Sequence, residues 1–230
     1  MVKSYVSLTS LEDPRRLDKS LDFLLDLGID GLHLDVMRTT PKGTASPFLP
    51  ECVSAIADYA RSKQRYDAFK VDVHLLVPMQ HLAVRNYKRK GISGIVLDSG
   101  SFQDNPKRFV RSLFDIRNDA PKMRSGASYS LTGISAEQAF IKDLDYVVYT
   151  VSGTDGLDNI SLYRLKEFIS MKKGTNQHTD VGTNPLMDIM VEGRLKADDV
   201  RVLSTLGVDA VILKYDNVQE YVPVLKSLRA

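Results

Sequence analysis

The sequence predicts a closed (β/α)8 barrel, the TIM-barrel fold, from three observations. Eight short apolar runs alternate with longer segments that have the spacing of amphipathic helices. The phrases "DLGIDGLHLD", "RKGISGIVLD" and "TLGVDAVILK" each end a helix at glycine and then begin a strand. No G-x-G-x-x-G motif follows any of these strands, and 230 residues fit eight such units better as a closed barrel than as an open doubly wound sheet.

Each predicted element follows from a local pattern. The predicted strands cover residues 4–9, 31–37, 69–77, 94–99, 124–130, 145–152, 186–193 and 208–215. The helical segment "PRRLDKSLDFLLDLG" has Asp13 as its N-cap, Pro14 in its first turn and Gly28 as its stop signal. The segments "NPKRFVRSLFDIRNDA" and "SLYRLKEFISMKK" follow the same logic. The polar stretch 172–185 is expected to form a surface loop, with His178 in solvent.

Composition limits the classes of function. The chain has 31 Lys and Arg against 29 Asp and Glu, so no basic surplus favours nucleic acid or a membrane surface, and neither partner is expected. The single cysteine, Cys52, excludes an internal disulfide and cysteine-rich zinc frameworks, so any metal must be held by His and carboxylates. We expect residues 1–230 to form a single cytoplasmic barrel domain, and a homo-oligomer is compatible with this composition.

Ligand-type side chains stand inside three of the predicted strands. Side chains alternate along a strand, so His33 and Asp35 in "GLHLDVM" point to the same face. The third strand contributes Asp72 and His74, and the seventh ends at Glu192. Barrel enzymes use the carboxyl ends of their strands, and imidazoles with carboxylates suit zinc, iron, manganese or cobalt. The sequence therefore predicts a divalent metal site, the alternative being that Asp35 caps a loop and Glu192 begins an exposed turn.

Five motifs carry a family resemblance. "SYVSLTS", "HLDVM", "VDVHLLV", "YTVSG" and "DIMVEG", in this order and spacing, resemble the ribulose-phosphate 3-epimerase family, whose barrels are of the ribulose-phosphate-binding type. The resemblance runs along the whole chain. It implies a metal-dependent isomerase of pentose phosphate metabolism, which inverts the carbon next to the ketone of a phosphorylated ketose. Ribulose 5-phosphate, converted to xylulose 5-phosphate, or a related sugar phosphate would be the substrate.

The resemblance also implies roles for individual residues. His33, Asp35 and His74 would be metal ligands, and Glu192 stands where the family has an aspartate ligand. Asp35 and Glu192 would be the two acid/base groups on either side of an enediolate. The predicted substrate contacts are Ser7, Met37, Gly153, Gly156, Gly193, Arg194 and Lys214, the last two through their charge rather than through the resemblance.

The departures from the family concern the substrate loops. Arg194 and Lys214 replace small family residues, and we expect them to bind a phosphate by charge, a solvated pair at the rim being the alternative. Arg38 and Thr39 replace the family's Asp-Gly, and Asp98 stands where the family usually has a histidine.

The sequence is compatible with two other functions. One is a barrel that has lost the reaction and binds a sugar phosphate or a protein partner. The other treats "FKVDVHLL" as the Lys-Asp strand of related decarboxylase and aldolase barrels, with Lys70 as the catalyst beside Asp72. That second alternative needs no transition metal.

Overall fold

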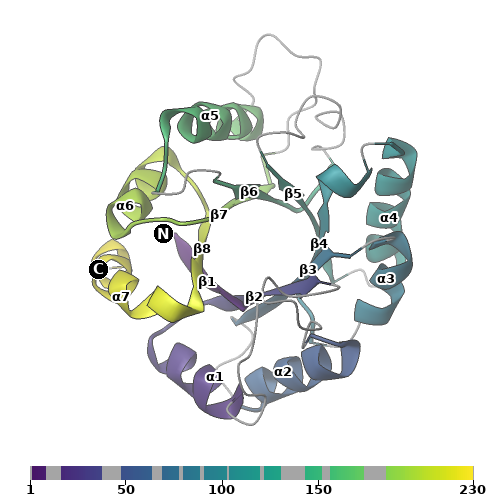
Figure 1. The fold of residues 1–230 in the computed structure, drawn as a ribbon, viewed down its shortest axis with the longest axis horizontal. Helices are drawn as coiled ribbons and strands as arrows, with labels where there is room; N and C mark the ends of the chain where they lie inside the picture. The colour runs from purple at the N-terminus through teal and green to yellow at the C-terminus, as the bar shows by residue number, and fades with distance from the viewer. Residues whose placement is uncertain are drawn as a thin grey trace.

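The computed structural model describes residues 2–8, 17–37, 48–63, 69–77, 80–88, 91–102, 104–119, 122–130, 143–151, 156–173 and 185–229. Eight parallel strands close into a barrel in chain order, which confirms the predicted fold class (Figure 1). The strands are β1 (Lys3–Leu8), β2 (Gly31–Met37), β3 (Lys70–Leu76), β4 (Gly94–Asp98), β5 (Arg124–Tyr129), β6 (Tyr146–Thr150), β7 (Asp188–Glu192) and β8 (Ala210–Lys214). Each matches its predicted range to within two residues at either end.

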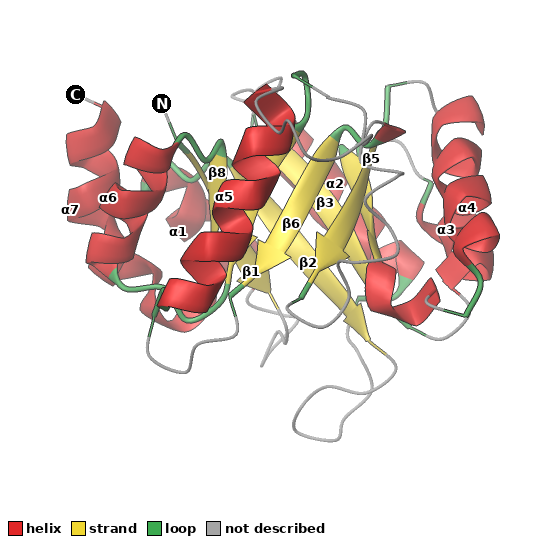
Figure 2. Ribbon diagram, turned by 90° about the horizontal axis from the view of Figure 1, so that it is seen from above, coloured by secondary structure: helices red, strands yellow, loops and turns green. Residues whose placement is uncertain are grey.

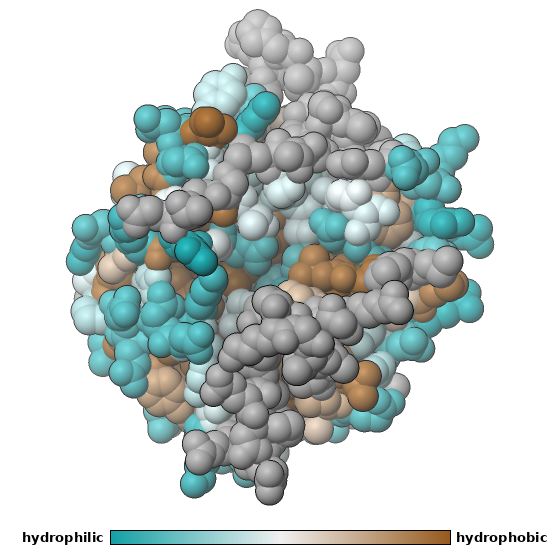
Figure 3. Space-filling model, in the orientation of Figure 1, coloured by the Kyte–Doolittle hydropathy of each residue, from teal (hydrophilic) through white to brown (hydrophobic). Residues whose placement is uncertain are grey.

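Helices pack along the outside of the barrel (Figure 2). They are α1 (Leu17–Asp26), α2 (Pro50–Ser62), α3 (Gln80–Tyr87), α4 (Pro106–Asp119), α5 (Asn159–Lys173), α6 (Ala197–Leu206) and α7 (Val218–Arg229), with short 3-10 turns η2 (Ser99–Phe102) and η4 (Tyr215–Asn217). Hydrophilic residues spread over the outer ring of helices in the space-filling view, as expected for helices whose other face covers a barrel (Figure 3). None of the helices in the described ranges is both long and apolar enough to cross a bilayer.

The helix boundaries predicted from the sequence agree with the structure at some positions and differ at others. Gly28 adopts a φ of 74° just after α1, so the stop signal is confirmed, while Asp13 and Pro14 lie outside the described residues. The predicted loop 172–185 is wrong at its start, because α5 continues to Lys173. Lys172 is held in the helix by an ion pair of 2.6 Å to Asp209, a contact between segments distant in sequence. His178 lies outside the described residues.

The lower part of the barrel interior, toward the N-terminal ends of the strands, is filled by large side chains. A buried cluster inside the barrel consists of Tyr5, Val96, Tyr146, Val148, Met190, Ala210 and Ile212, and it reaches up to the level of His74 at Val96. Tyr146 fits because two neighbouring strands carry glycine opposite its ring. A Cβ at Gly126 would lie 2.7 Å from the Tyr146 ring, and one at Gly94 would lie 2.5 Å from its hydroxyl. The barrel is therefore a packed core below its functional end.

Candidate metal and substrate site

Strand register brings the predicted ligand residues together. β2 and β3 pair so that Asp35 lies opposite His74, and β1 places Ser7 opposite His33. Alternation turns these side chains into the barrel, and closure through β8 and β1 brings Glu192 of β7 to the same place. His33, His74 and Glu192 each offer a ligand atom, and these atoms all lie within 4.8 Å of one another.

His33 is the least satisfied polar residue at this site. The side chain is fully buried, and neither ring nitrogen has a hydrogen-bond partner in the described part of the chain. Its Nε2 lies 3.6 Å from Asp35 Oδ1 and 3.7 Å from Glu192 Oε2, too long for hydrogen bonds. Two atoms that bind one metal at about 2.0–2.2 Å in tetrahedral geometry stand about 3.3–3.6 Å apart. The spacing around His33 thus fits a divalent cation between these groups.

Electrostatics favour the ligand form of His33. Burial lowers the pKa of this imidazole, and the neighbouring His74 acts in the same direction, outweighing the attraction of Asp35 and Glu192. His33 is therefore neutral near pH 7, with a lone pair on one nitrogen. Neutral imidazole is the form that ligates transition metals.

His74 is held from both sides. Its Nδ1 lies 3.1 Å from Asp35 Oδ1, and its Nε2 lies 2.8 Å from Ser128 Oγ. Burial alone would lower the pKa of His74, but the hydrogen bond to Asp35 and the charge of Glu192 raise it. Burial likewise opposes ionisation of Asp35, yet its bond to His74 keeps the Asp35 pKa below the usual range. The Ser7 hydroxyl donates to the other Asp35 oxygen at 2.8 Å.

Glu192 is held by a neighbour on the adjacent strand. Thr150 lies opposite it in the register of β6 and β7, and the Thr150 hydroxyl donates to Glu192 Oε1 at 2.6 Å. This leaves Oε2 facing His33. Sequence reasoning missed both Thr150 and Ser128. Alternation places Ser128 on the inward face of the fifth strand, two residues after Gly126, but does not tell which residue it meets across the barrel.

A cavity of about 380 Å³ opens beside this cluster. Its walls are formed by Ser7, Leu8, Asp35, Thr150, Glu192, Gly193, Ile212, Lys214, Tyr215 and Asp216. Lys214 is the cation among these described residues, and it ends β8 with an exposed side chain. The cavity thus has the carboxylates of Asp35 and Glu192 in its wall and the positive charge of Lys214 at its rim.

The remaining predicted contacts are dispersed. Gly193 lines the cavity with a φ of 137°, whereas Gly156 packs against Asp199, whose Oδ2 would lie 2.7 Å from a Cβ at that position. Arg194 is exposed beyond the end of β7 and, with half-buried Met37, is absent from the described cavity wall. The structure therefore does not bring Arg194 and Lys214 together in one cavity. Gly153, Arg38 and Thr39 lie outside the described residues.

Asp72 and Lys70 belong to deeper parts of the barrel than His74. Asp72 lies opposite His33, and its Oδ1 is 2.9 Å from the position of a Cβ on Gly94. Lys70 begins β3, four residues before His74, a separation of about 13 Å along a strand. Lys70 thus lies at the start of β3, away from the cavity at the carboxyl ends, and this position does not favour Lys70 as the catalyst of that cavity.

Asp98 ends β4, where the resembled family usually has a histidine. Its carboxylate accepts hydrogen bonds from the Ser101 backbone N–H at 3.1 Å and from the Ser101 hydroxyl at 2.6 Å. The negative charge of Asp98 contributes to the raised pKa of His74. Asp98 therefore organises the turn after β4 and acts on the site through charge.

The comparisons define the class of fold. No family model and no curated protein matches the chain. KGPDC from Streptococcus mutans is similar over 99% of this chain and 96% of its own, with a TM-score of 0.66 and 12% identity. Phosphoribosyl anthranilate isomerase from Thermus thermophilus is similar over 99% and 100%, with a TM-score of 0.61 and 11% identity. At these identities the likeness establishes a (β/α)8 barrel.

A further solved structure is KGPDC from Streptococcus mutans in complex with a phosphorylated D-sugar. It is similar over 98% of this chain and 96% of its own, with a TM-score of 0.62 and 10% identity. The chain described here is thus a TIM barrel whose strand ends gather two histidines and two carboxylates beside a cavity.

Proposed function

We propose that this chain is a metal-dependent epimerase that inverts the carbon next to the ketone of a phosphorylated ketose, such as ribulose 5-phosphate. One observation carries the proposal: a buried, neutral His33 whose Nε2 lies without a partner among the described residues, between Asp35 and Glu192. Burial of such a nitrogen is costly unless something binds it.

The donor set supports a cation at this place. His33, His74 and Glu192, with Asp35 beside them, would hold zinc, iron, manganese or cobalt. Such an ion, when bound, acts as a Lewis acid that stabilises the negative charge of an enediolate. Ser128, by its hydrogen bond to His74 Nε2, leaves Nδ1 as the nitrogen on the Asp35 side.

Inversion needs a base on one face of the reacting carbon and an acid on the other. Asp35 from β2 and Glu192 from β7 approach the cavity from different strands and are the carboxylates in its described wall nearest to His33. Ser7 and Thr150 each donate to one oxygen of their carboxylate and so fix its orientation. In the proposed step one carboxylate takes the proton while the other delivers a proton to the opposite face.

The substrate class rests on the rim of the cavity and on the comparisons. Lys214 supplies a cation suited to a phosphate, although Asp216 nearby reduces the positive field. One structural neighbour forms a complex with a phosphorylated D-sugar, which supports a ligand of this class. A cavity of about 380 Å³ is at the lower end of the range for small-molecule sites.

One observation favours the alternative of a barrel that binds a sugar phosphate without turning it over. Both nitrogens of His74 already have partners, in Asp35 and Ser128, so this residue is stable as a hydrogen-bonded group. A lapsed enzyme would keep the cavity and this closed network while losing proton transfer.

Wash-in of solvent deuterium separates the two functions. Metal-loaded protein is incubated with ribulose 5-phosphate in D₂O, and exchange at the carbon next to the ketone is followed by NMR. We expect exchange in the wild type and none in Glu192→Gln, because an amide is not a base. Glu220→Gln, which changes an exposed glutamate on α7, is the matched control. Absence of exchange in metal-loaded wild type contradicts the epimerase and leaves the binding function.

A further inference from the structure

A second cavity, of about 370 Å³, opens at the opposite end of the barrel from the candidate site. Lys70 and Arg124 are the first residues of β3 and β5, and Ser93 directly precedes β4, so the cavity lies where these strands begin. Arg61 of α2 forms part of the opposite wall. We call this the cationic cavity.

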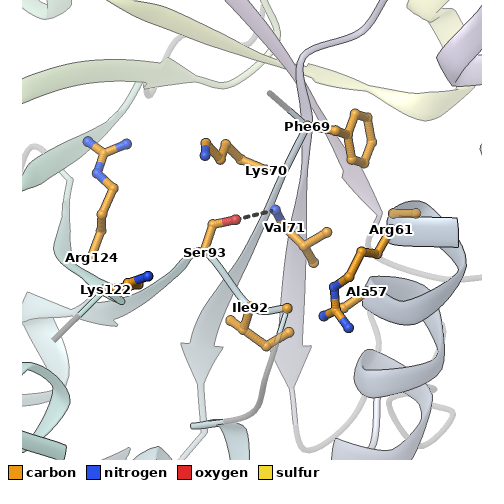
Figure 4. A pocket seen from close by; sticks show the side chains of 11 residues that line it. Ala57, Arg61, Phe69, Lys70, Val71, Ile92, Ser93, Lys122 and Arg124 are labelled. Carbon is orange, nitrogen blue, oxygen red and sulfur yellow. Dashed lines mark hydrogen bonds between the residues drawn. The ribbon is translucent and has the colours of Figure 1, made fainter. Parts of the chain in front are cut away.

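The polar wall of the cationic cavity carries one sign of charge. Its cations are Arg61, Lys70, Lys122 and Arg124, and no carboxylate is among the described lining residues. Figure 4 shows Arg124 and Lys122 on one side and Arg61 on the other, with Lys70, Ser93 and Val71 between them. Gathered cations with no acidic residue in the same described wall favour an anionic ligand.

Two of these cations are held in place by carboxylates outside the wall. The Arg61 guanidinium pairs with Asp58 at 3.0 Å, and the Arg124 guanidinium pairs with Asp188 at 2.6 Å. The Arg124 guanidinium also donates to the Asp145 carbonyl at 3.2 Å and lies 4.5 Å from the centre of the Tyr146 ring. A guanidinium has five N–H donors, of which these contacts use only some. The ion pairs therefore orient the two groups while leaving donors for a ligand.

The backbone of the cationic cavity is shaped around Arg61. Gly91 has a φ of 96°, and a Cβ there would lie 1.9 Å from the Arg61 guanidinium. Only glycine allows the guanidinium to lie against the chain at this point. Ser93 Oγ accepts a hydrogen bond of 3.0 Å from the Val71 N–H, which anchors the hydroxyl in the wall and leaves its proton as a donor (Figure 4).

The rest of the wall is apolar. Ala57 and Ala60 of α2, Phe69 before β3 and Ile92 before β4 line it. A ligand that suits both parts carries an anion at one end and an apolar or aromatic body at the other. Arginine forks match the oxygens of a phosphate in paired contacts, which favours phosphate as the anion.

We propose that the cationic cavity is a binding site for a small phosphomonoester with a ring-bearing body, of the size of a nucleoside monophosphate. The phosphate lies among Arg61, Lys122 and Arg124, and the body lies against Phe69 and Ala57. This site is separate from the proposed epimerase site, because Tyr5, Tyr146 and their neighbours fill the barrel between the two ends. The proposal therefore stands independently of the proposed function.

Isothermal titration with adenosine 5′-monophosphate tests the site. We expect one molecule bound per chain in the wild type and a loss of about tenfold in affinity for each contacting cation removed. The variants are Lys122→Gln and the double variant Arg61→Gln/Lys122→Gln, with circular dichroism to confirm folding. Lys122 is exposed, so its single variant gives a result even if the double variant fails to fold.

Two matched controls remove the same charge elsewhere. Lys107→Gln changes an exposed lysine on α4, and Lys214→Gln changes the rim of the other cavity. Both should bind adenosine 5′-monophosphate like the wild type. No binding in the wild type, an equal loss in Lys107→Gln, or a loss confined to Lys214→Gln overturns the proposal. Binding of inorganic phosphate with no gain in affinity for the nucleotide overturns the ring-bearing ligand.

Discussion

Ser128 and His74 form a hydrogen bond inside the barrel, with Ser128 Oγ 2.8 Å from His74 Nε2. The other ring nitrogen of His74 faces Asp35 at 3.1 Å. Outer partners of this kind orient histidines that ligate metals and fix their tautomer. Ser128, which belongs to no obvious sequence motif, therefore fixes the orientation of the His74 ring relative to His33 and Glu192.

Removal of that hydroxyl should weaken metal binding without unfolding the barrel. We expect Ser128→Ala to lower the affinity for zinc or manganese by roughly 10- to 100-fold, because the His74 ring loses its orienting partner. Competition with a chelating dye measures the affinity. Ser227→Ala, on the exposed side of α7, is the control, and equal affinities in the two variants contradict an orienting role for Ser128.

Loss of a ligand should empty the site. The protein is expected to hold about one divalent transition metal per chain, as the gathering of His33, His74 and Glu192 suggests. His74→Ala should strip the metal, while His81→Ala on α3 should retain it. Elemental analysis after gel filtration measures both, and full stoichiometry in His74→Ala would falsify the ligand set.

The length of Glu192 should matter for turnover. Aspartate is one methylene shorter, so Glu192→Asp cannot keep both the contact to Thr150 and the approach to His33. A misplacement of about 1 Å can cost about 100-fold in rate, and we expect a fall of that order in kcat/KM for ribulose 5-phosphate. Deuterium exchange should slow in parallel. If turnover is as fast in Glu192→Asp as in the wild type, Glu192 does not move the proton.

Lys214 and Arg194 should differ in their effect on substrate binding. Lys214 lines the cavity and Arg194 does not, although both are exposed. Lys214→Gln should raise KM for a phosphorylated ketose by about tenfold, the value of one charge-assisted contact, while Arg194→Gln leaves KM near the wild-type value. Steady-state kinetics with unchanged metal content checks this, and the reverse order of effects would restore Arg194 as the phosphate ligand.

Asp72 should make folding stability depend on pH. Burial raises the pKa of this carboxyl, the charges of Arg124, Lys70 and Lys3 oppose the rise and Asp188 adds to it, and the resulting pKa is about 6. The folded state thus binds the proton more tightly than the unfolded state, so the stabilisation is complete below about pH 4 and is lost as pH rises to about 6. A shift of this size corresponds to about 3 kcal/mol.

The Asp72→Asn variant tests that assignment. Asparagine stays neutral, so the variant should unfold at a higher urea concentration than the wild type at about pH 7.5, with the difference shrinking toward about pH 5. The comparison between variant and wild type cancels the titration of other groups. A variant that is less stable than the wild type at the higher pH would show that ionised Asp72 stabilises the barrel.

The sequence predicted the part of the site that depends on strand alternation. His33, Asp35 and His74 come together because each lies on the inward face of a strand that pairs with its neighbour in the chain. Ser128 and Thr150 could not be found in the same way. Which serine or threonine meets a histidine or glutamate depends on the stagger of the closed barrel, which no local pattern encodes.

Alternation along a strand predicts which charged residues face the barrel interior, but not how deep in the barrel each one lies. Asp72 shares the inward face with His74, yet one step of alternation places it in the layer of Tyr146 and Gly94. Arg194 and Lys214 resemble each other in sequence position, but β7 ends at Glu192 whereas β8 continues to Lys214. Both strands have five residues, but Glu192 pairs with Ile212, so β8 continues two residues past the end of β7 and keeps Lys214 at the cavity.

Tyr146 limits the routes by which protons from solvent can reach the candidate site. With Tyr5 and the apolar residues of the same cluster, it closes the barrel below the layer of His33. Within the described part of the barrel, bulk water therefore reaches Asp35 and Glu192 from the mouth at the carboxyl ends of the strands. A sugar bound in that mouth would block the route by which Asp35 and Glu192 exchange protons with solvent. A proton taken from the substrate would then be retained until the product leaves.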